Sequence, residues 1–377
     1  MTLSQPPIWL IVLAFVGAIG PLVFFHELGH YLVGRLFGVG AETFSIGFGH
    51  EITGWTDKQG TRWKIGWLPL GGYVRFVGDM NAASAPGDVE ELPPGLRERS
   101  FPVKPVWQRF LIVLAGPAAN YLLAILIFAG FFAAFGMPST PSLVAGVQQG
   151  SAAAIAGIRP GDRIESVNGE NAANFEDLER IVELRPGENV SVQIVRNGQS
   201  KLLQARLGTA IVHDEFGQGY HFGRLGVLAT GEQLRPVPAL QLIPEAVRYS
   251  YVLTRVTMQG VWRIVTGRMS RDQLAGPLKI PEIAGQQAAL GPLVFVQFLA
   301  LLSINLGFIN LLPVPVLDGG HLFFYFLEAI RRRPVSIRFQ EWAFRGGFAL
   351  IIAWYLFLTM NDLGSFGLWD RLGRLIG

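Results

Sequence analysis

Four long apolar stretches constrain the fold of this chain more than any other feature of its sequence. They cover residues 7–37, 106–136, 292–316 and 343–360. Each is long enough, or nearly so, to cross a hydrocarbon layer about 30 Å thick as a helix. Half of the 377 residues are hydrophobic and only 16% are charged, which is typical of a membrane protein with a soluble part. We therefore expect a polytopic α-helical membrane protein with about four transmembrane helices.

A metal-binding motif, His26-Glu27-Leu28-Gly29-His30, lies inside the first apolar stretch. On a helix, two imidazoles four residues apart share one face and can both reach a single Zn²⁺. Glu27 is placed between them to act as general base on water at that ion. The alternative is that polar residues are tolerated at a helix end. Three ionisable groups in hydrocarbon are costly, however, and usually functional.

A catalytic zinc needs a third protein ligand, and the third apolar stretch offers Asp318. Two prolines, Pro313 and Pro315, interrupt helical hydrogen bonding just before it, which is tolerated at membrane depth only where backbone is buried in protein or faces a wet cavity. An uncompensated Asp in hydrocarbon costs roughly 2.5–3.5 kcal/mol, and coordination to a dication would remove that cost. Weaker candidate ligands are the histidines outside the apolar stretches or at their edge: His50, His213, His221 and His321.

The distribution of Lys and Arg predicts the orientation. These residues are concentrated in the loops over residues 38–105 and 330–342, so both loops should be cytoplasmic and both termini outside. His26, His30 and Asp318 then all lie near the cytoplasmic ends of their spans. The net charge of +3 bears on topology and does not suggest a nucleic-acid partner. The absence of cysteine excludes thiolate zinc ligands and thiol nucleophiles.

Residues 39–77 have the period-2 pattern of strands. Two alternating aromatic and aliphatic runs flank the polar turn 57–60, and Gly71-Gly72-Tyr73 continues the second run. The aromatic density favours a hairpin or small sheet that dips into the membrane interface, with an ordinary soluble hairpin as the alternative. The stretch 80–100 is polar and Pro-rich and indicates a cytoplasmic loop.

From about residue 143 to 208 the composition is that of a small soluble domain. We expect a short helix near 151–158, a tight turn at Val167-Asn168-Gly169, a helix over 175–184, and a strand that ends at Asn197-Gly198. This order of motifs resembles a PDZ domain, a fold that binds extended chain ends, and one copy is visible. A further strand is predicted at 223–227, and an amphipathic helix, in the interface or on a plain surface, over 240–267.

Within the second apolar stretch, Gly116-Pro117-Ala118-Ala119-Asn120 interrupts an otherwise apolar helix. Small residues permit close helix contact, and Asn120 is a polar group at membrane depth. This segment can serve either helix packing or the active site, and the sequence favours neither.

Taken together, HELGH in a first span, Gly116-Pro-x-x-Asn120 in a second, a PDZ insertion and the run Asn310 to His321 resemble the site-2 protease family of intramembrane zinc metalloproteases. The likeness is strongest to the bacterial branch represented by the regulator of sigma-E protease. It implies His26, His30 and Asp318 as zinc ligands and Glu27 as catalytic base. Candidate substrate-binding residues are Asn120, Asn305, Asn310, Gly71, Gly72 and Tyr73.

The resemblance further implies a multi-pass protein of the bacterial inner membrane, with its active site near the cytoplasmic side and its PDZ domain in the periplasm. Expected partners are the lipid bilayer and transmembrane substrates such as an anti-sigma factor or remnant signal peptides. The best-known enterobacterial member has two tandem PDZ domains and this chain shows one. The expected segments are a first span (1–38), a membrane-associated β region (39–105), a second span (106–136), the PDZ domain with flanking strands (137–235), an amphipathic helical segment (236–291), a third span (292–330), and a fourth span with tail (331–377).

Two other classes compete with an intramembrane protease. A membrane-anchored binding scaffold with a structural metal would have no need of Glu27 beside its ligands. A transporter with a metal site at the membrane midplane also uses broken helices, but four spans without an internal repeat argue against it.

Overall fold

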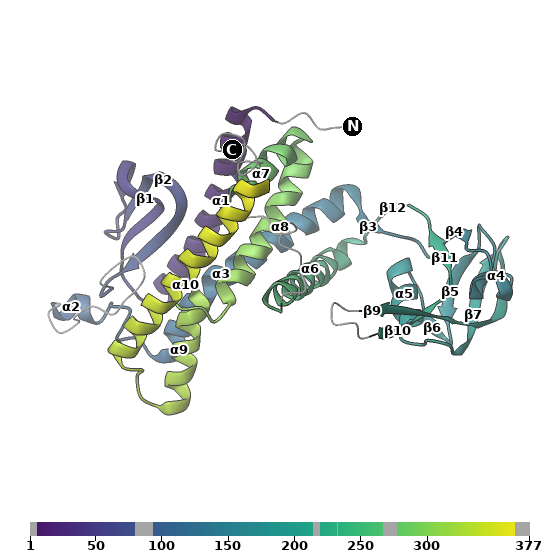
Figure 1. Cartoon of the computed structure of the whole chain (residues 1–377). Helices are drawn as coiled ribbons and strands as arrows, with labels where there is room; N and C mark the ends of the chain where they lie inside the picture. The colour runs from purple at the N-terminus through teal and green to yellow at the C-terminus, as the bar shows by residue number, and fades with distance from the viewer. Residues whose placement is uncertain (1–5, 80–92, 214–218, 232, 267–276, 366–377) are drawn as a thin grey trace, which may run out of the picture. The chain divides into compact units, whose positions relative to one another are not determined.

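The computed structural model describes residues 6–79, 93–213, 219–231, 233–266 and 277–365. The chain divides into two compact units, one formed by residues 1–129 and 243–377 and the other by residues 130–242 (Figure 1). The expected cytoplasmic loop falls largely outside the described residues, since only its last part, from residue 93, is covered.

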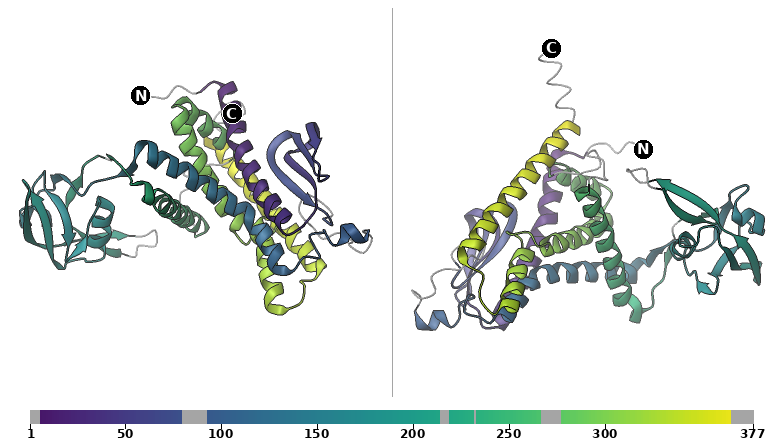
Figure 2. Two further views of the ribbon diagram at one scale, coloured as in Figure 1. Left: turned by 180° about the vertical axis from the view of Figure 1, so that it is seen from behind. Right: turned by 60° about the horizontal axis from the view of Figure 1, so that its bottom comes forward.

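The first unit is a bundle of helices with a two-stranded β-ribbon beside α1 (Figure 2). Four helices are long and apolar enough to cross a membrane: α1 (Ile8–Leu36), α3 (Val106–Phe135), α8 (Pro292–Leu311) and, within α10 (Ile337–Ser365), the segment Arg338–Met360. The four expected spans are thus present as helices. The remaining helices of this unit are α2 (Pro94–Arg97), α6 (Leu242–Val265), α7 (Lys279–Ala289) and α9 (Asp318–Arg331).

The third apolar stretch differs from the single span expected over 292–330. Helix α8 ends at Leu311, and a new helix, α9, begins at Asp318. Pro313 and Pro315 lie in the connection and cannot donate backbone hydrogen bonds, which is why the helix does not continue. Residues Gly319 and Gly320 allow α9 to fold back tightly, because a Cβ on Gly320 would lie 2.6 Å from the Val314 carbonyl oxygen. Asp318 is therefore at the first turn of a separate helix.

Helices α1 and α3 approach closely at the metal-binding motif. A Cβ on Gly29 would overlap the backbone carbonyl of Ala115 and come within 2.8 Å of the Ala119 Cβ. A Cβ on Gly116 would overlap the imidazole of His30. Glycine at both positions is what lets the two helices come close enough for α3 to line the back of the motif.

The β-ribbon consists of β1 (Ala41–Thr56) and β2 (Arg62–Phe76) and is strongly curled. Phe44 is in register with both Val74 and Trp63, so the first half of β1 lies between the two halves of β2. The expected polar turn joins the strands, and its Asp57 accepts hydrogen bonds from Tyr31 of α1 (3.3 Å) and from the Trp63 indole (3.0 Å). The ribbon is thereby tied to the helix that carries the metal-binding motif.

The second unit has a four-stranded sheet in the order β6 (Glu170–Asn171), β5 (Arg163–Val167), β7 (Asn189–Arg196), β8 (Gln199–Arg206). Helices α4 (Ala152–Ala156) and α5 (Phe175–Glu183) complete its core. The strand pairs that accompany it are β3 (Met137–Ser139) with β12 (Gln233–Arg235), β4 (Val144–Val147) with β11 (Val227–Ala229), and β9 (Gly208–His213) with β10 (Gly219–Arg224).

Most elements expected in this unit are confirmed. The turn at Asn168-Gly169 has positive φ at both residues and joins β5 to β6. Asn174 caps α5 by accepting a hydrogen bond from the Asp177 backbone N–H (2.8 Å). The strand expected at 223–227 is instead divided, because Gly226 has a φ of +83° and separates β10 from β11. The helix expected over 240–267 is α6.

A buried ion pair in the second unit predicts acid sensitivity. Arg196 donates hydrogen bonds to both carboxylate oxygens of Asp162 (2.7 Å each) and so holds the pKa of Asp162 below its usual value. A lowered native-state pKa stabilises the protein fully at pH values above the unfolded-state pKa of this carboxyl, which is about 4. The stabilisation is lost as the pH falls through the lower, native-state pKa. We expect Asp162→Asn to lower the local unfolding free energy at pH 7 by about 1–3 kcal/mol and to flatten its decline on acidification.

Hydrogen exchange of the β5 and β7 amides in the full-length protein, corrected for intrinsic rates at pH 7, at about pH 4 and at about pH 2.5, measures both effects, because the loss falls below the unfolded-state pKa. The control is Glu170→Gln, which removes the half-exposed partner of Arg185 and should change little. If the local unfolding free energy of the Asp162→Asn protein fell with pH as it does in wild type, the Asp162–Arg196 pair would not be the source of the acid sensitivity.

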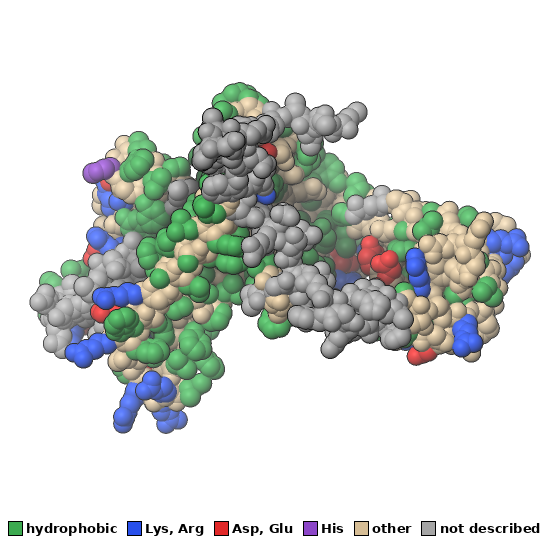
Figure 3. Space-filling model, in the orientation of Figure 1, with side chains coloured by type: hydrophobic (Ala, Val, Ile, Leu, Met, Phe, Trp, Pro, Cys, Tyr) green, Lys and Arg blue, Asp and Glu red, His purple; other side chains and the backbone are tan. Residues whose placement is uncertain are grey.

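The surface of the first unit is largely apolar (Figure 3). Exposed large hydrophobic side chains are spread along α10 in particular, among them Trp342, Phe348, Leu350 and Trp354. Only 6% of the apolar window of α10 is buried in the protein, so its side chains require an apolar environment from outside. Lys and Arg side chains gather at the end where α9 leads into α10.

Candidate metal centre

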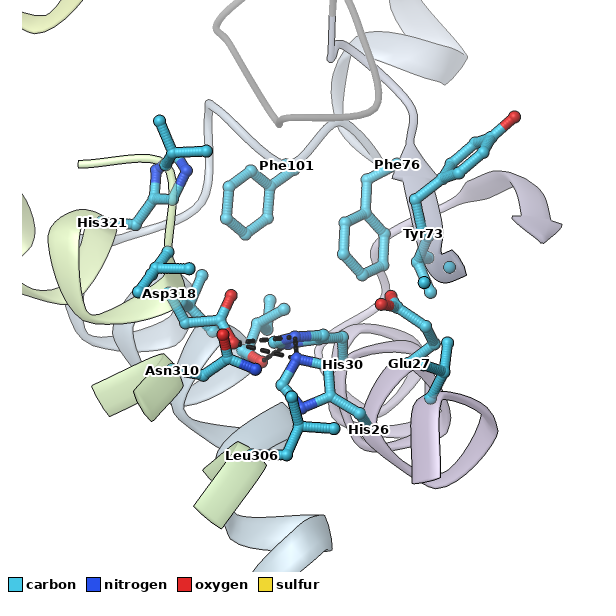
Figure 4. A pocket seen from close by; sticks show the side chains of 18 of the residues that line it. His26, Glu27, His30, Tyr73, Phe76, Phe101, Leu306, Asn310, Asp318 and His321 are labelled. Atoms are coloured by element: carbon cyan, nitrogen blue, oxygen red, sulfur yellow. Dashed lines mark hydrogen bonds and ion pairs between the residues drawn. The ribbon is translucent and has the colours of Figure 1, made fainter. Parts of the chain in front are cut away.

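Three side chains that are far apart in the sequence meet at one point. His26 and His30 come from α1 and Asp318 from the start of α9 (Figure 4). The Asp318 Oδ2 atom lies 3.1 Å from His26 Nε2 and 3.4 Å from His30 Nε2, and the two Nε2 atoms are 3.3 Å apart. The group fits the three-ligand set of a catalytic zinc, which leaves a coordination position for water.

The chemistry of the donor atoms favours a cation between them. Asp318 Oδ2 is buried and accepts no hydrogen bond of ordinary geometry, although both imidazoles face it. Two ring nitrogens and a carboxylate oxygen converge on one point, and with both rings deprotonated at Nε2 they would offer three donor atoms to a dication. Coordination would also compensate a carboxylate that is placed among apolar, membrane-length helices.

The orientation of His30 is set from behind by α3. Its Nδ1 atom lies 2.9 Å from the backbone carbonyl oxygen of Ile112, and a carbonyl can only accept. The ring proton is therefore on Nδ1, and Nε2 presents its lone pair toward Asp318. This is the arrangement that metal-binding histidines commonly have. Gly116, one turn further along α3, leaves room for the ring.

Glu27 lies next to the ligand group but is not part of it. Its carboxylate is on the side of α1 that faces the β-ribbon (Figure 4) and lies near the backbone N–H of Val74. Gly72 of β2 packs so closely that a Cβ there would lie 3.1 Å from the Glu27 Cγ and 2.6 Å from the Val23 Cγ1. The second half of β2 thus positions the candidate base.

The ligand group opens onto a cavity of about 390 Å³. Its walls come from α1, the second half of β2, the start of α3, the end of α8 and the start of α9. Among the residues that line it are His26, Glu27, His30, Gly71, Gly72, Tyr73, Asn310 and Asp318. The cavity is large enough for a stretch of extended peptide beside the ligand group.

The structure brings four of the six expected substrate-binding residues to this cavity: Gly71, Gly72, Tyr73 and Asn310. The Tyr73 side chain turns its hydroxyl away from the ligand group (Figure 4). The other two face elsewhere. Asn305 accepts a hydrogen bond from Thr257 of α6 (2.9 Å), and Asn120 is fully buried beside His26. Neither lines the cavity, because the rotation of each helix points its amide toward a neighbouring helix.

Three residues at the site were not predicted as site residues from the sequence. His321 was expected at the cytoplasmic edge as a rival ligand, but it lines the cavity outside the three-ligand group. The i,i+3 spacing of Asp318 and His321 on α9, which places them on one face, was the available signal. The backbone groups of Ile112 and Val74 carry no sequence signal, since any residue supplies them.

The comparisons with known proteins agree with this geometry. Two histidines and a glutamate on a membrane-length helix that meet an aspartate of a neighbouring helix are the arrangement of a membrane metalloprotease. The family model of Peptidase family M50 matches residues 14–354, and the chain belongs to this family of site-2 protease-type zinc metalloproteases.

Two relatives illustrate the match. A protein of Agrobacterium fabrum named "Putative zinc metalloprotease" is 42% identical over 94% of this chain and 96% of its own length. Metalloprotease MmpA of Caulobacter vibrioides is 38% identical over 98% of each chain. Among solved structures, the PDZ domain of an SdrC-like protein from Listeria monocytogenes is 16% identical, and the match covers 23% of this chain and 84% of that chain. Its TM-score of 0.19 is too low to indicate a shared fold. The chain is thus a membrane zinc metalloprotease.

Proposed function

We propose that this enzyme hydrolyses peptide bonds within or near transmembrane segments, with His26, His30 and Asp318 as zinc ligands and Glu27 as general base. The observation that carries the proposal is the meeting of α1 and α9 inside a group of membrane-length helices, with Glu27 beside the three ligand atoms. Bound zinc would lower the pKa of water toward neutrality and polarise the scissile carbonyl. Glu27 takes the proton of the attacking water and passes it to the leaving amine.

Cleavage of a model membrane-spanning substrate tests this proposal. The purified protein and a single-span substrate are reconstituted in lipid vesicles, and cleavage is followed by mass spectrometry of the products. Stripping the protein with a chelator should abolish cleavage, and stoichiometric Zn²⁺ should restore it. Cleavage sites confined to soluble substrates, with membrane segments left intact, would contradict the proposal.

Substrate extension is the second part of the proposal. A helical substrate hides its carbonyl groups in i→i+4 hydrogen bonds and must be extended before attack. The second half of β2 is paired through Tyr73 and Gly72 with Ser45 and Ile46 of β1 on one side, and no strand among the described residues pairs with its other side. We infer that the substrate adds there as a further strand. The Asn310 amide would hydrogen-bond to backbone groups of the substrate that have lost their helical partners.

The variant Asn310→Leu should therefore reduce cleavage about 10- to 100-fold, the loss expected when a buried backbone group of the bound substrate is left without its partner. Zinc content should stay at the wild-type level, because Asn310 is outside the three-ligand group. Both quantities are measured on the same preparation, by the vesicle assay and by atomic absorption. Loss of zinc in this variant would reassign Asn310 to the support of the metal.

The second unit is proposed to be a PDZ domain that filters substrates by size. The order of its strands and helices supports this, as does a groove of about 400 Å³ between α5 and the chain around Gly226, with a hydrophobic lining from Phe175, Leu178 and Val182. We propose that it lies in the periplasm and keeps bulky extracytoplasmic domains away until another protease has trimmed the substrate. Anti-sigma factors and remnant signal peptides of the bacterial inner membrane are the substrate classes that fit this role. The Lys- and Arg-rich loops support the corresponding orientation.

A deletion that respects the strand pairs tests the filter. Removing residues 140–232 takes out the pair β4 and β11 together, and a short Gly-Ser link can join Ser139 to Gln233, which are neighbours in the pair β3 and β12. The deletion variant should cleave a substrate with an intact extracytoplasmic domain that wild type leaves whole. Both proteins should cleave the trimmed substrate equally. If the intact substrate still resists the variant, the unit does not act as a filter.

A further inference from the structure

Asn120 lies behind His26, on the side away from the cavity. Its side chain is fully buried, and its Nδ2 atom is 3.1 Å from His26 Nδ1. Its backbone carbonyl accepts a hydrogen bond from the Ser303 hydroxyl of α8 (2.8 Å), which holds this part of α3 in place. Asn120 therefore connects α1, α3 and α8 directly behind one of the ligand residues.

The two histidines differ in what sets their tautomer. His30 has a carbonyl acceptor at Nδ1, which places its ring proton on that atom. The partner that the structure gives His26 Nδ1 is the Asn120 amide, which can present either a donor or an acceptor. With Nδ2 toward the ring, Nδ1 accepts, and the ring proton is on Nε2, the atom that faces Asp318. A metal at Nε2 requires the opposite tautomer.

The other end of the amide does not decide its orientation. Asn120 Oδ1 is buried and has no hydrogen-bonding partner among the described residues. Turning the amide by half a turn about its last side-chain bond therefore breaks no second bond. The turn brings Oδ1 to His26 Nδ1, where it accepts the proton that metal binding leaves on that atom.

We propose that Asn120 is a positioning residue for the metal: its amide oxygen accepts the Nδ1–H of His26 and so presents Nε2 as a ligand. This inference rests on the proposed zinc site. It assigns Asn120 to the support of the metal in place of substrate contact, and it explains a polar side chain buried at membrane depth. An asparagine suits the position because its amide can follow the ring proton, whichever nitrogen carries it.

The test compares two substitutions at this position. Asn120→Leu has a similar volume but cannot hydrogen bond, and it should weaken zinc binding about 10- to 100-fold, the range found when a partner of this kind is removed. Asn120→Asp offers only acceptors at Nδ1 and should keep zinc affinity within about threefold of wild type or increase it. If Asn120 served packing alone, the buried charge of the Asp variant would be the more damaging change.

Zinc affinity of the full-length protein in detergent is measured by competition with a chromophoric chelator, and monodispersity by size-exclusion chromatography. Asn305→Leu is the matched control: it also replaces a helix-contacting Asn of the bundle, but its partner is Thr257, so zinc affinity should be unchanged. Asn120→Ala replaces the Leu variant in the comparison if the latter aggregates. Equal affinity in the Leu or Ala variant and wild type, or weaker binding in the Asp than in the Leu variant, overturns the inference. A wild type whose zinc affinity is the same as that of His26→Ala instead overturns the zinc site itself.

Discussion

Replacing Glu27 by Gln should reduce cleavage of a membrane-spanning substrate about 10²- to 10⁴-fold, the contribution expected of a general base. Glutamine keeps the size of the side chain and an oxygen that can accept from the Val74 N–H, but it cannot take a proton from water. Because Glu27 is outside the three-ligand group, zinc content should be unchanged. Single-turnover cleavage in vesicles and metal analysis of the same sample measure the two quantities.

The matched control for this prediction is Glu282→Gln on α7. Glu282 bonds to Gln286 one turn away on its own helix and does not line the cavity, so its replacement should leave cleavage unchanged. If Glu27→Gln also lost its zinc, the carboxylate would be required for metal binding. If it retained most of its activity, another group would have to serve as the base. Either result contradicts the role proposed for Glu27.

The second large effect is expected from a single methyl group. Gly116→Ala places a Cβ inside the van der Waals radius of His30 Nε2, one of the three ligand atoms. The ring cannot retreat without breaking its hydrogen bond to Ile112, which belongs to the same helix as Gly116. We expect zinc bound per chain to fall at least tenfold under dilute chelator, with cleavage lost in parallel.

Another glycine of the same helix provides the comparison. Gly130→Ala, also on α3, meets no atom within 4 Å, so zinc binding should be that of wild type, and the gain in helix propensity is worth up to about 1 kcal/mol. Size-exclusion chromatography of both variants separates loss of the site from loss of the fold. A Gly116→Ala protein that bound zinc normally would show that α1 and α3 are further apart than the structure places them.

The sequence was most informative where local pattern determines structure. The hydropathy of the four stretches predicted the membrane-length helices, since an apolar run of that length has no other stable conformation in lipid. The i,i+4 spacing in the HELGH motif placed both histidines on one helical face. Pro313 and Pro315 indicated that the third stretch breaks before Asp318, although the break proved complete, with α9 as a separate helix.

The polar residues inside the helices were less predictable. Asn120, Asn305 and Asn310 all lie in apolar stretches, and residue type does not distinguish them. The structure directs Asn310 into the cavity, Asn305 to Thr257 and Asn120 to His26. Which way a side chain points on an apolar helix depends on the neighbours against which the helix packs, and helices that are apolar on all sides have no hydrophobic face to signal it.

The sequence by itself therefore determined the membrane class, the helical spans and the residue types that can hold zinc, because these follow from hydropathy and from spacings within a few residues. Only the tertiary structure decided that Asp318 meets His26 and His30 across almost 300 positions of the chain, that Glu27 contacts the backbone of β2, and that Asn120 lies behind His26. Contacts of this kind depend on how closely α1 and α3 approach. That closeness rests on the lack of a side chain at Gly29 and Gly116, whose effect appears only when both helices are in place.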